Sequence, residues 1–299
     1  MYRLIGLGLG LAGSASVVVP AIAREPLHLA PSSKWVVNYA DDSCRLARSF
    51  GADNKRVDLI LDRFRPGRQV APTLVGQPIA IRGDVRTVIF RFGSDGGGQK
   101  REFEVGRMQN GDPAMIVTGR LHVSGPTEAE ERVEDGDEDA GEPEPFGSDL
   151  ASNNAVTFVD IRIPGKQIVR LDTGPMGAPM KALADCTSDL LRGWGIDVDA
   201  HQSLSRRAVP ATKVGKWLSS SDYPVAMLIR GRQALVHFRL IVDEIGKPKS
   251  CHIQQSTRPQ AFDDAVCRGI MAKAQFKPAL DATGKPIMSY YVNRVRFTL

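Results

Sequence analysis

The chain has 299 residues, of which 42% are hydrophobic and 24% charged, and its formal net charge is +5. This length suffices for two domains of roughly 100–200 residues each, and the composition excludes a collagen-like or fully disordered protein. Charge is uneven, because ten acids and one base between Glu128 and Glu144 leave +14 on the rest of the chain. A basic surface suits nucleic acid, anionic lipid or peptidoglycan, but no nucleic-acid motif accompanies it.

The first residues predict export. Arg3 precedes an uncharged run from Leu4 to Ala23, and Ala21-Ile22-Ala23 has small residues where a signal peptidase reads the chain. We therefore predict a cleavable signal peptide over residues 1–23, a periplasmic location and no nucleic-acid partner. The alternative is a retained inner-membrane anchor with the rest of the chain facing the periplasm, since the run is just long enough to span a bilayer. Pro20 and four glycines weaken such a helix.

The four cysteines predict two disulfides, because an even count in an exported chain is typical of a disulfide framework. Three pairings are possible, and the division into domains favours Cys44–Cys186 and Cys251–Cys267. No Cys-x-x-Cys occurs, and no two of the five histidines stand at ligand spacing. We therefore predict no metal site, no redox-active thiol pair and no cofactor.

Residues 30–196 predict a strand-rich α+β domain. Its strands show β-branched and aromatic residues in alternation, broken by turn signals rich in glycine and proline. One short helix is predicted over Ala40–Phe50 and one amphipathic helix over Ala178–Trp194. The predicted strands are Val57–Phe64, Val85–Phe92, Ala114–Val123, Ala155–Ile163 and Lys166–Leu171.

Two polar stretches interrupt this pattern. Residues 126–149 form an acidic, low-complexity stretch with almost no apolar side chain, which predicts a disordered loop. If Cys44 pairs with Cys186, that loop is an insertion inside the N-terminal domain. Residues 197–216 are polar and basic without periodicity, and we interpret them as a linker.

Residues 217–299 carry the sharpest pattern. A short helix follows Pro224, and Ala234–Val242 alternates as a strand with one mostly apolar face and His237 on the solvent side. A second strand runs from about Pro248 to Gln254. A helix from Pro259 has a core stripe at i, i+4 and i+8, and places Cys267 where it can meet Cys251. A long final strand is predicted over Ile287–Leu299. The stripe residues are Phe262, Val266 and Ile270.

An ordered set of short motifs runs through this region. It comprises Tyr223-Pro224, Val242-Asp243-x-x-Gly246-Lys247, Phe262-Asp263, Phe276-Lys277-Pro278-Ala279, Gly284-Lys285-Pro286 and Val292–Leu299. With these motifs the region ~217–299 resembles the C-terminal domain of TonB energy-transducer proteins. The pair Cys251 and Cys267 resembles the two-cysteine versions of that domain.

The resemblance implies a small antiparallel sheet with one packed helix. The whole chain is then an α+β protein, with a strand-rich domain followed by this module. The family binds a peptide of an outer-membrane receptor by adding it as a strand to an open sheet edge. By position that edge is the final strand, with Tyr290, Val292, Arg294 and Arg296 as partner-binding residues. The simpler interpretation is that Arg294 and Arg296 are only solvated edge charges.

These implications lead to a non-enzymatic periplasmic protein of the TonB family. We expect it to bind an outer-membrane TonB-dependent receptor or another envelope protein, and to take part in TonB-dependent transmembrane transport. A full transducer also has a retained anchor and a Pro/Lys-rich spacer, and the chain shows neither clearly. The alternative is therefore a scaffold or adaptor without energy coupling. Homodimer formation and inner-membrane association stay open.

A remote alternative rests on Leu171-Asp172-Thr173-Gly174. The Asp-Thr-Gly core is typical of retropepsin-like aspartic proteases, in which two carboxylates share a proton and activate water. A three-residue match is weak, and Pro175 stands where a small residue is usual. A β-turn between a strand and the helix from Ala178 explains the same residues, so we predict no hydrolase activity at Asp172.

Overall fold

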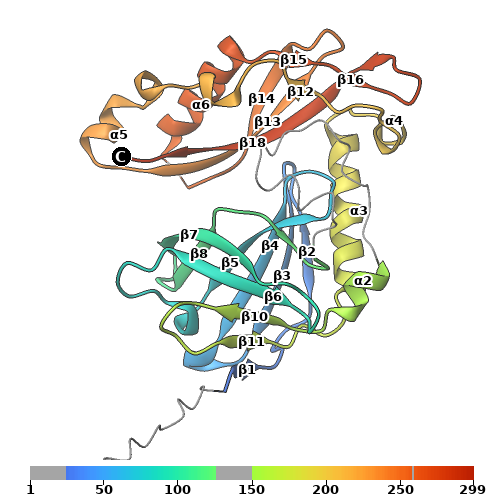
Figure 1. The fold of residues 1–299 in the computed structure, drawn as a ribbon. Coiled ribbons are helices and arrows are strands. Elements are labelled where there is room, and N and C mark those ends of the chain that lie inside the picture. Colours follow the sequence, from blue (N-terminus) through green and yellow to red (C-terminus); the bar gives the residue numbers. More distant parts are fainter. Residues whose placement is uncertain (1–24, 126–149, 258) are drawn as a thin grey trace, which may run out of the picture.

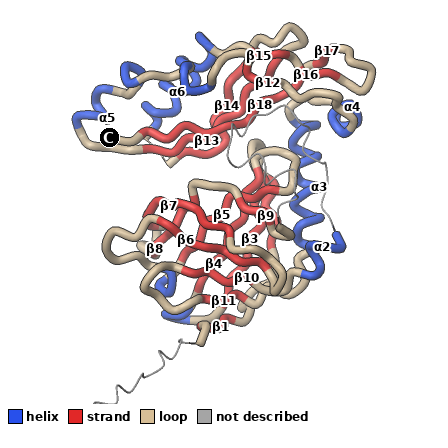
Figure 2. The backbone as a smooth tube through the Cα atoms, viewed as in Figure 1, coloured by secondary structure: helices blue, strands red, loops and turns tan. Residues whose placement is uncertain are grey.

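A computed structural model of the chain describes residues 25–125, 150–257 and 259–299 (Figure 1). It has a strand-rich N-terminal unit and a C-terminal unit made of an antiparallel sheet and a packed helix, as the sequence predicts. Strands dominate both units, and helices lie at their outer sides (Figure 2). The predicted signal peptide, residues 1–23, and the predicted acidic loop, residues 126–149, lie outside the described residues.

The N-terminal unit is a barrel of eleven strands. Ten of them follow the order β1-β11-β10-β6-β7-β8-β5-β4-β3-β2, and β9 pairs with β5. All pairs are antiparallel except β1 with β11. The sheet curls back on itself, so that the end of β1 meets the end of β3. There the N–H of Gly51, which follows β3, donates to the carbonyl of Ala30, which follows β1, at 2.8 Å. The strands are β1 (Leu27–Leu29), β2 (Val36–Tyr39), β3 (Cys44–Phe50), β4 (Val57–Arg63), β5 (Gln69–Val75), β6 (Thr87–Phe92), β7 (Gln99–Arg107), β8 (Pro113–Val117), β9 (Leu121–His122), β10 (Val159–Arg162) and β11 (Val169–Leu171).

Helices close one side of this barrel. The long helix α3 (Gly177–Gly193) buries an apolar stripe against the core, including Met180, Leu183 and Leu190. The disulfide Cys44–Cys186 ties α3 to β3, which confirms the first predicted pairing. From there α3 runs along the barrel toward the C-terminal unit (Figure 1). The short elements of the N-terminal unit are η1 (Asp53–Lys55), η2 (Gln77–Ile79) and α2 (Leu150–Ala155).

One predicted element of this unit was wrong, and two predicted strands have other bounds. The residues predicted to form a helix over 40–50 include strand β3, because Cys44, Leu46 and Phe50 alternate into the core between β2 and β4. The strand predicted over residues 155–163 is shortened by α2 at its start. The strand predicted over residues 114–123 is divided into β8 and β9, while β5 and β7 were not predicted.

The C-terminal unit is a three-stranded sheet in the order β14-β13-β18. The central strand β13 (Ala234–Val242) pairs antiparallel with β14 (Pro248–Ser256) and β18 (Ser289–Phe297). Helix α6 (Gln260–Lys273) lies across one face. Its predicted stripe is confirmed, since Phe262, Val266 and Ile270 pack in one core with β13. The disulfide Cys251–Cys267 joins α6 to β14, as predicted.

The stretch 197–216, which we interpreted as a linker, contains regular structure and packs against the C-terminal unit. Strand β12 (Val209–Pro210) pairs with β15 (Phe276–Lys277). The Leu280 N–H donates to the Arg206 carbonyl at 2.8 Å. The remaining elements around the sheet are α4 (Val198–Gln202), η3 (Val214–Lys216), η4 (Ser220–Asp222), α5 (Val225–Ile229), β16 (Ala279–Leu280) and β17 (Pro286–Ile287).

Candidate functional site

Strand β18 is one edge of the three-stranded sheet, since its neighbour in the described residues is β13 alone. An edge strand presents main-chain N–H and C=O groups that can pair with another extended chain. Which residues present them follows from the hydrogen bonds of β13. The Thr257 N–H donates to the Leu235 carbonyl at 3.1 Å, and the Leu235 N–H donates to the Thr257 hydroxyl at 2.9 Å. The main-chain groups of Leu235 therefore point toward β14.

Main-chain groups alternate sides along an antiparallel ladder, and directly opposed residues point both inward or both outward. Leu235 stands opposite Arg296 in an unbroken β13–β18 register. The N–H and C=O of Arg296, and of every second residue before it, thus point away from β13. The Arg294 N–H fits this arrangement, since it donates to the Asn293 side-chain oxygen at 2.7 Å. The outward set consists of the four predicted residues Tyr290, Val292, Arg294 and Arg296.

The side chains of these four residues lie on the face of the sheet opposite α6. They stand there because their partners on β13 are the residues of its second face, Leu235, His237, Arg239 and Ile241. That face is not bare. Val292 is buried. Arg296 pairs with Glu102 at 3.2 Å and also with Glu104, both on β7 of the barrel. The sequence missed this contact, because Glu102 and Glu104 lie almost 200 positions before Arg296.

The N-terminal unit covers this second face through a polar interface, formed by Asp42, Phe64, His237, Arg239 and Gln254. His237 was predicted on the solvent side of its strand, and this prediction was wrong. The side chain is 8% exposed and stacks on Phe64, with ring centroids 4.5 Å apart. The alternation of β13 was read correctly, but both of its faces are buried.

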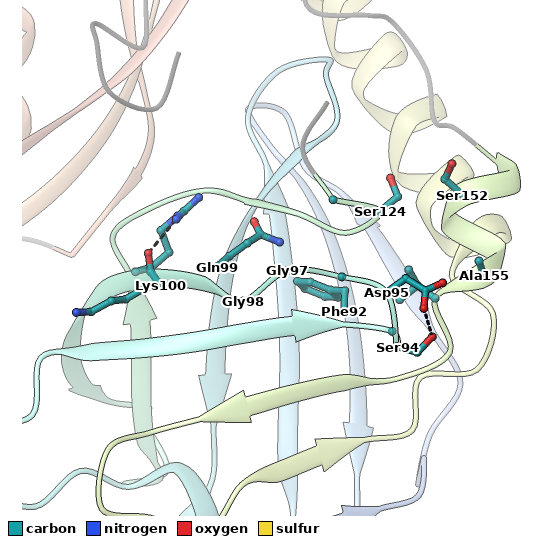
Figure 3. Close-up of a pocket in the computed structure, with 15 residues that line it drawn as sticks. Phe92, Ser94, Asp95, Gly97, Gly98, Gln99, Lys100, Ser124, Ser152 and Ala155 are labelled. Carbon is teal, nitrogen blue, oxygen red and sulfur yellow. Dashed lines mark hydrogen bonds between the residues drawn. The ribbon is translucent and has the colours of Figure 1, made fainter. Parts of the chain in front are cut away.

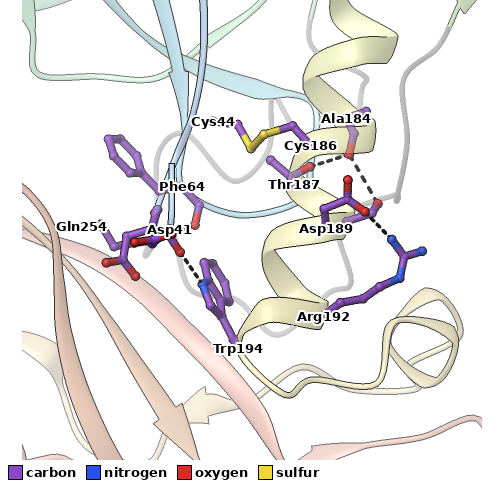
Figure 4. Close-up of a disulfide and its surroundings, with 12 residues drawn as sticks. Asp41, Cys44, Phe64, Ala184, Cys186, Thr187, Asp189, Arg192, Trp194 and Gln254 are labelled. Atoms are coloured by element: carbon purple, nitrogen blue, oxygen red, sulfur yellow. Dashed lines mark hydrogen bonds and ion pairs between the residues drawn. A yellow bond between two sulfur atoms is a disulfide. The ribbon is translucent and has the colours of Figure 1, made fainter. Parts of the chain in front are cut away.

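Arg239 is the buried cation of the polar interface. Its Nη1 donates to Asp42 Oδ1 at 2.8 Å, and its guanidinium lies 3.9 Å from the centroid of the Trp194 ring. The indole N–H of Trp194 donates in turn to the Asp41 carbonyl at 3.1 Å (Figure 4). Gln254 bridges the two units with its side-chain amide, which donates to the carbonyls of Asp42 at 2.7 Å and Phe64 at 2.9 Å.

Burial sets the ionisation of the groups at this face. It lowers the pKa of His237 to about 3, and the positive charges of Arg294 and Arg120 add to the effect. Burial also lowers the pKa of His201 on α4, whose Nε2 lies 2.9 Å from the Ser289 hydroxyl. Both imidazoles are therefore neutral at neutral pH. A neutral His237 is compatible with the arginines around it, whereas an imidazolium would be repelled by them.

Beside the polar interface lies an apolar seam, formed by Leu191, Ile196, Val198 and Ile241. Trp194 and Tyr290 border it, with ring centroids 5.6 Å apart in an edge-on arrangement. The seam joins the end of α3, the start of α4 and the second face of β13. It fixes the sheet at the end of the helix that the Cys44–Cys186 disulfide anchors to the barrel.

The remote protease site has a structural explanation. The carboxylate of Asp172 is 44% exposed and stands 3.9 Å from His28 Nδ1. The Thr173 carbonyl accepts hydrogen bonds from Arg48 at 2.8 Å and Trp35 at 3.4 Å, and Gly174 has a φ of +64°. Residues 172–176 are an irregular connection between β11 and α3, whose N–H groups at Asp172 and Gly174 donate to the distant carbonyls of Leu29 and Thr157, so the predicted β-turn was wrong.

Other features of the described ranges do not form a chemical centre. A hollow of about 760 Å³ lies at the glycine-rich β6–β7 hairpin, lined by Ser94, Asp95, Lys100 and Ser152 among others (Figure 3). Within residues 25–125, 150–257 and 259–299, no three His, Cys, Asp or Glu side chains gather as a metal site would require. In the same ranges no helix combines the length and apolar character needed to cross a bilayer.

Comparison with known families agrees with this geometry. The family model for the C-terminal region of Gram-negative bacterial TonB proteins matches residues 219–299. Those residues hold the β14-β13-β18 sheet and α6, and they are a domain of that family, which confirms the predicted resemblance. No curated protein matches the chain. We refer to residues 219–299 below as the C-terminal TonB domain.

Proposed function

We propose that the C-terminal TonB domain binds an extended segment of an outer-membrane receptor or another envelope protein by strand addition to β18. The observation that carries this proposal is the outward direction of the main-chain groups of Tyr290, Val292, Arg294 and Arg296 on an edge strand. An incoming strand pairs with those groups by main-chain hydrogen bonds, at Arg294 in place of the Asn293 side-chain oxygen, and side chains on either face then supply specificity.

The proposal includes a periplasmic protein that is exported by removal of residues 1–23 and has no catalytic activity. The match of residues 219–299 to the TonB C-terminal family supports a role in transport across the Gram-negative envelope. The bound partner would then be pulled or positioned through the sheet edge. No chemistry at the edge is needed for this role, because the interaction consists of hydrogen bonds and side-chain packing alone.

The adaptor alternative is favoured by a specific observation. Arg239, Gln254 and Phe64 fix the sheet against the N-terminal barrel. Residues 206–211 pair with residues 275–280 of the C-terminal unit and so do not form an extended spacer. A docked sheet suits a protein that presents a partner in one orientation. Measuring whether partner release requires the proton-motive force in intact cells separates energy transduction from passive holding.

Strand addition is tested with Arg294→Pro, which removes an outward N–H and places a proline ring at the free edge. Edge strands accept proline where the N–H faces solvent, so the fold should survive. Arg294→Ala is the matched control, since it removes the same side chain and keeps the N–H. We expect Arg294→Pro to lose the envelope proteins that the full chain retains from an envelope extract, and Arg294→Ala to keep them.

Thermal unfolding of both variants establishes that each is folded before binding is compared. Equal retention of the same proteins by the two variants would show that the partner does not pair with β18. Loss in both would assign the interaction to the Arg294 side chain and contradict recognition by the main chain.

A further inference from the structure

Helix α5 presents its apolar side to solvent. Val225, Leu228 and Ile229 are spaced i, i+3 and i+4, so they lie on one face of the helix. Their side chains are 69%, 51% and 79% exposed, whereas Met227 is buried against the core of the domain. A helix on the surface of a soluble protein normally turns such a stripe inward. This outward stripe therefore calls for a partner surface.

The apolar surface continues onto the segment after β18. Leu299, two positions beyond that strand, is also exposed, and its Cδ1 would lie 3.7 Å from a methyl group added at Gly231, two positions after the end of α5. We name Val225, Leu228, Ile229 and Leu299 the α5 patch. In Figure 1 helix α5 and the C-terminus lie at the end of the C-terminal TonB domain that is farther from α4.

The α5 patch has a basic border. Arg230 and Arg232 lie one and three positions after the end of α5 and are exposed, and neither guanidinium forms a hydrogen bond or ion pair with another described residue. No Asp or Glu occurs from Tyr223 to Val242. The nearest preceding acid, Asp222, accepts from the Ser219 N–H and pairs with Lys273 at 3.2 Å. The free charge beside the patch is therefore positive.

Size and composition decide between a protein partner and a lipid surface. A stable protein interface buries roughly 800 Å² per partner and is centred on Trp, Tyr and Arg. Four aliphatic side chains around a five-residue helix supply neither that area nor an aromatic anchor. A bilayer surface has no minimum area, takes aliphatic side chains at the acyl boundary, and offers phosphate oxygens to guanidinium groups.

We propose that the α5 patch, together with Arg230 and Arg232, docks the C-terminal TonB domain onto an anionic bilayer surface. The contact is weak and reversible, because a single small apolar contact with a few basic residues gives marginal membrane affinity. It does not depend on strand addition at β18. It holds one end of the edge strand close to the membrane, where envelope proteins expose their segments.

The test is co-sedimentation of the full chain with vesicles of phosphatidylcholine alone and of phosphatidylcholine with phosphatidylglycerol. We expect binding to the anionic vesicles that weakens as salt is raised. The double variant Leu228→Ser/Ile229→Ser should bind about tenfold more weakly, and Arg230→Gln/Arg232→Gln should lose the preference for anionic lipid. Ile245→Ser is the matched control, since Ile245 is equally exposed but lies in the β13–β14 turn.

Hydrogen exchange locates the contact independently of the uncharged run over residues 4–23. Amides of residues 225–232 should exchange more slowly with anionic vesicles present. Unchanged exchange there, or vesicle binding that survives Leu228→Ser/Ile229→Ser, would overturn the proposal. A dimer that forms without lipid and is abolished by the same double variant, with no vesicle binding, would also overturn it and assign the patch to a second copy of the chain.

Discussion

The two faces of β13, the central strand of the β14-β13-β18 sheet, are both buried, but by different means. The face toward α6 is apolar, with Val236, Phe238 and Leu240 packed against the stripe of α6. The face toward the N-terminal barrel carries His237 and Arg239, flanked along the strand by Leu235 and Ile241. One strand thus serves a domain core on one side and a contact between units on the other.

The difference teaches what each face can specify. Apolar packing tolerates several arrangements of similar volume, so the α6 face mainly stabilises the fold. Buried polar groups are costly unless particular partners satisfy them, so Arg239 and Gln254 permit one docked orientation, in which Asp42 and Phe64 are in reach. The second face contributes less to the free energy of unfolding. Its main effect is to set the orientation of the edge strand β18 relative to the N-terminal barrel.

The largest expected effect is on the apolar face. Phe262 is fully buried and packs on Phe297, with ring centroids 4.7 Å apart. Phe262→Ala should lower the free energy of unfolding by about 3–5 kcal/mol, because it removes a buried ring and leaves a cavity. Urea unfolding of the full chain measures the loss.

The matched control for Phe262→Ala is Ile229→Ala, which truncates an exposed aliphatic side chain of the same domain. It should change the free energy of unfolding by about 0.5 kcal/mol or less. Similar losses for the two variants would mean that the apolar face is not the main source of stability, and the contrast between the faces would not hold.

The second prediction concerns pH. The pKa of His237 is about 3 in the folded protein, through burial and the neighbouring arginines, against about 6.5 in the unfolded chain. Below pH 6.5 the unfolded state binds a proton that the folded state does not. The free energy of unfolding is therefore not reduced by His237 above pH 6.5, and it falls as the pH is lowered from 6.5 toward 3. At pH 5 the loss should be about 2 kcal/mol relative to pH 8.

His237→Phe isolates this effect, because a phenyl ring can still stack on Phe64 and does not titrate. Urea unfolding at pH 8 and pH 5 should show the wild type losing about 2 kcal/mol more than the variant. His201 titrates in the same direction and is present in both proteins, so its share cancels. Equal losses in the two proteins would mean that His237 is accessible to solvent and that the second face is not docked.

The smallest effect compares two ion pairs between the units. Arg239 is almost fully buried and Asp42 is 33% exposed, whereas both partners of the Arg296–Glu104 pair are more than a third exposed. A double-mutant cycle with Arg239→Gln and Asp42→Asn should give a coupling energy of about 1–2 kcal/mol. The cycle with Arg296→Gln and Glu104→Gln should give about 0.5 kcal/mol.

Salt sharpens the contrast between the two pairs. Raising the salt concentration should remove the coupling of Arg296 with Glu104 and leave most of that between Arg239 and Asp42, because solvent ions screen exposed charges more than buried ones. If the two couplings were equal and equally sensitive to salt, Arg239 would be solvated and the polar interface would not define an orientation.

The sequence allowed correct prediction wherever the physical signal was local. The i, i+4, i+8 spacing of Phe262, Val266 and Ile270 identified the buried face of α6, and the division of the four cysteines between the two predicted domains gave both disulfide pairings. The edge position of β18 followed from the family resemblance, whereas the binding role of its four outward residues stays a prediction.

The rest depends on contacts between distant parts of the chain. Nothing near His237 indicates that Phe64 will cover it, and Arg239 reads as a solvent-facing residue until Asp42 and Trp194 are placed beside it. Likewise, the stretch from Cys44 to Phe50, with Arg45 and Arg48 on opposite faces, resembles a short helix until β2 and β4 flank it. Such elements are fixed by their partners, which local pattern does not reveal.

The disulfide between Cys44 and Cys186 has a mechanical consequence. It joins the barrel wall to α3 eight positions before Trp194, which touches the sheet. Tension on a segment held at β18 would pass through the C-terminal TonB domain into α3 and then across a covalent bond to the barrel. Only the last turns of α3, between Cys186 and Trp194, would lie in that path, and the part of the helix before Cys186 would be bypassed by the covalent bond.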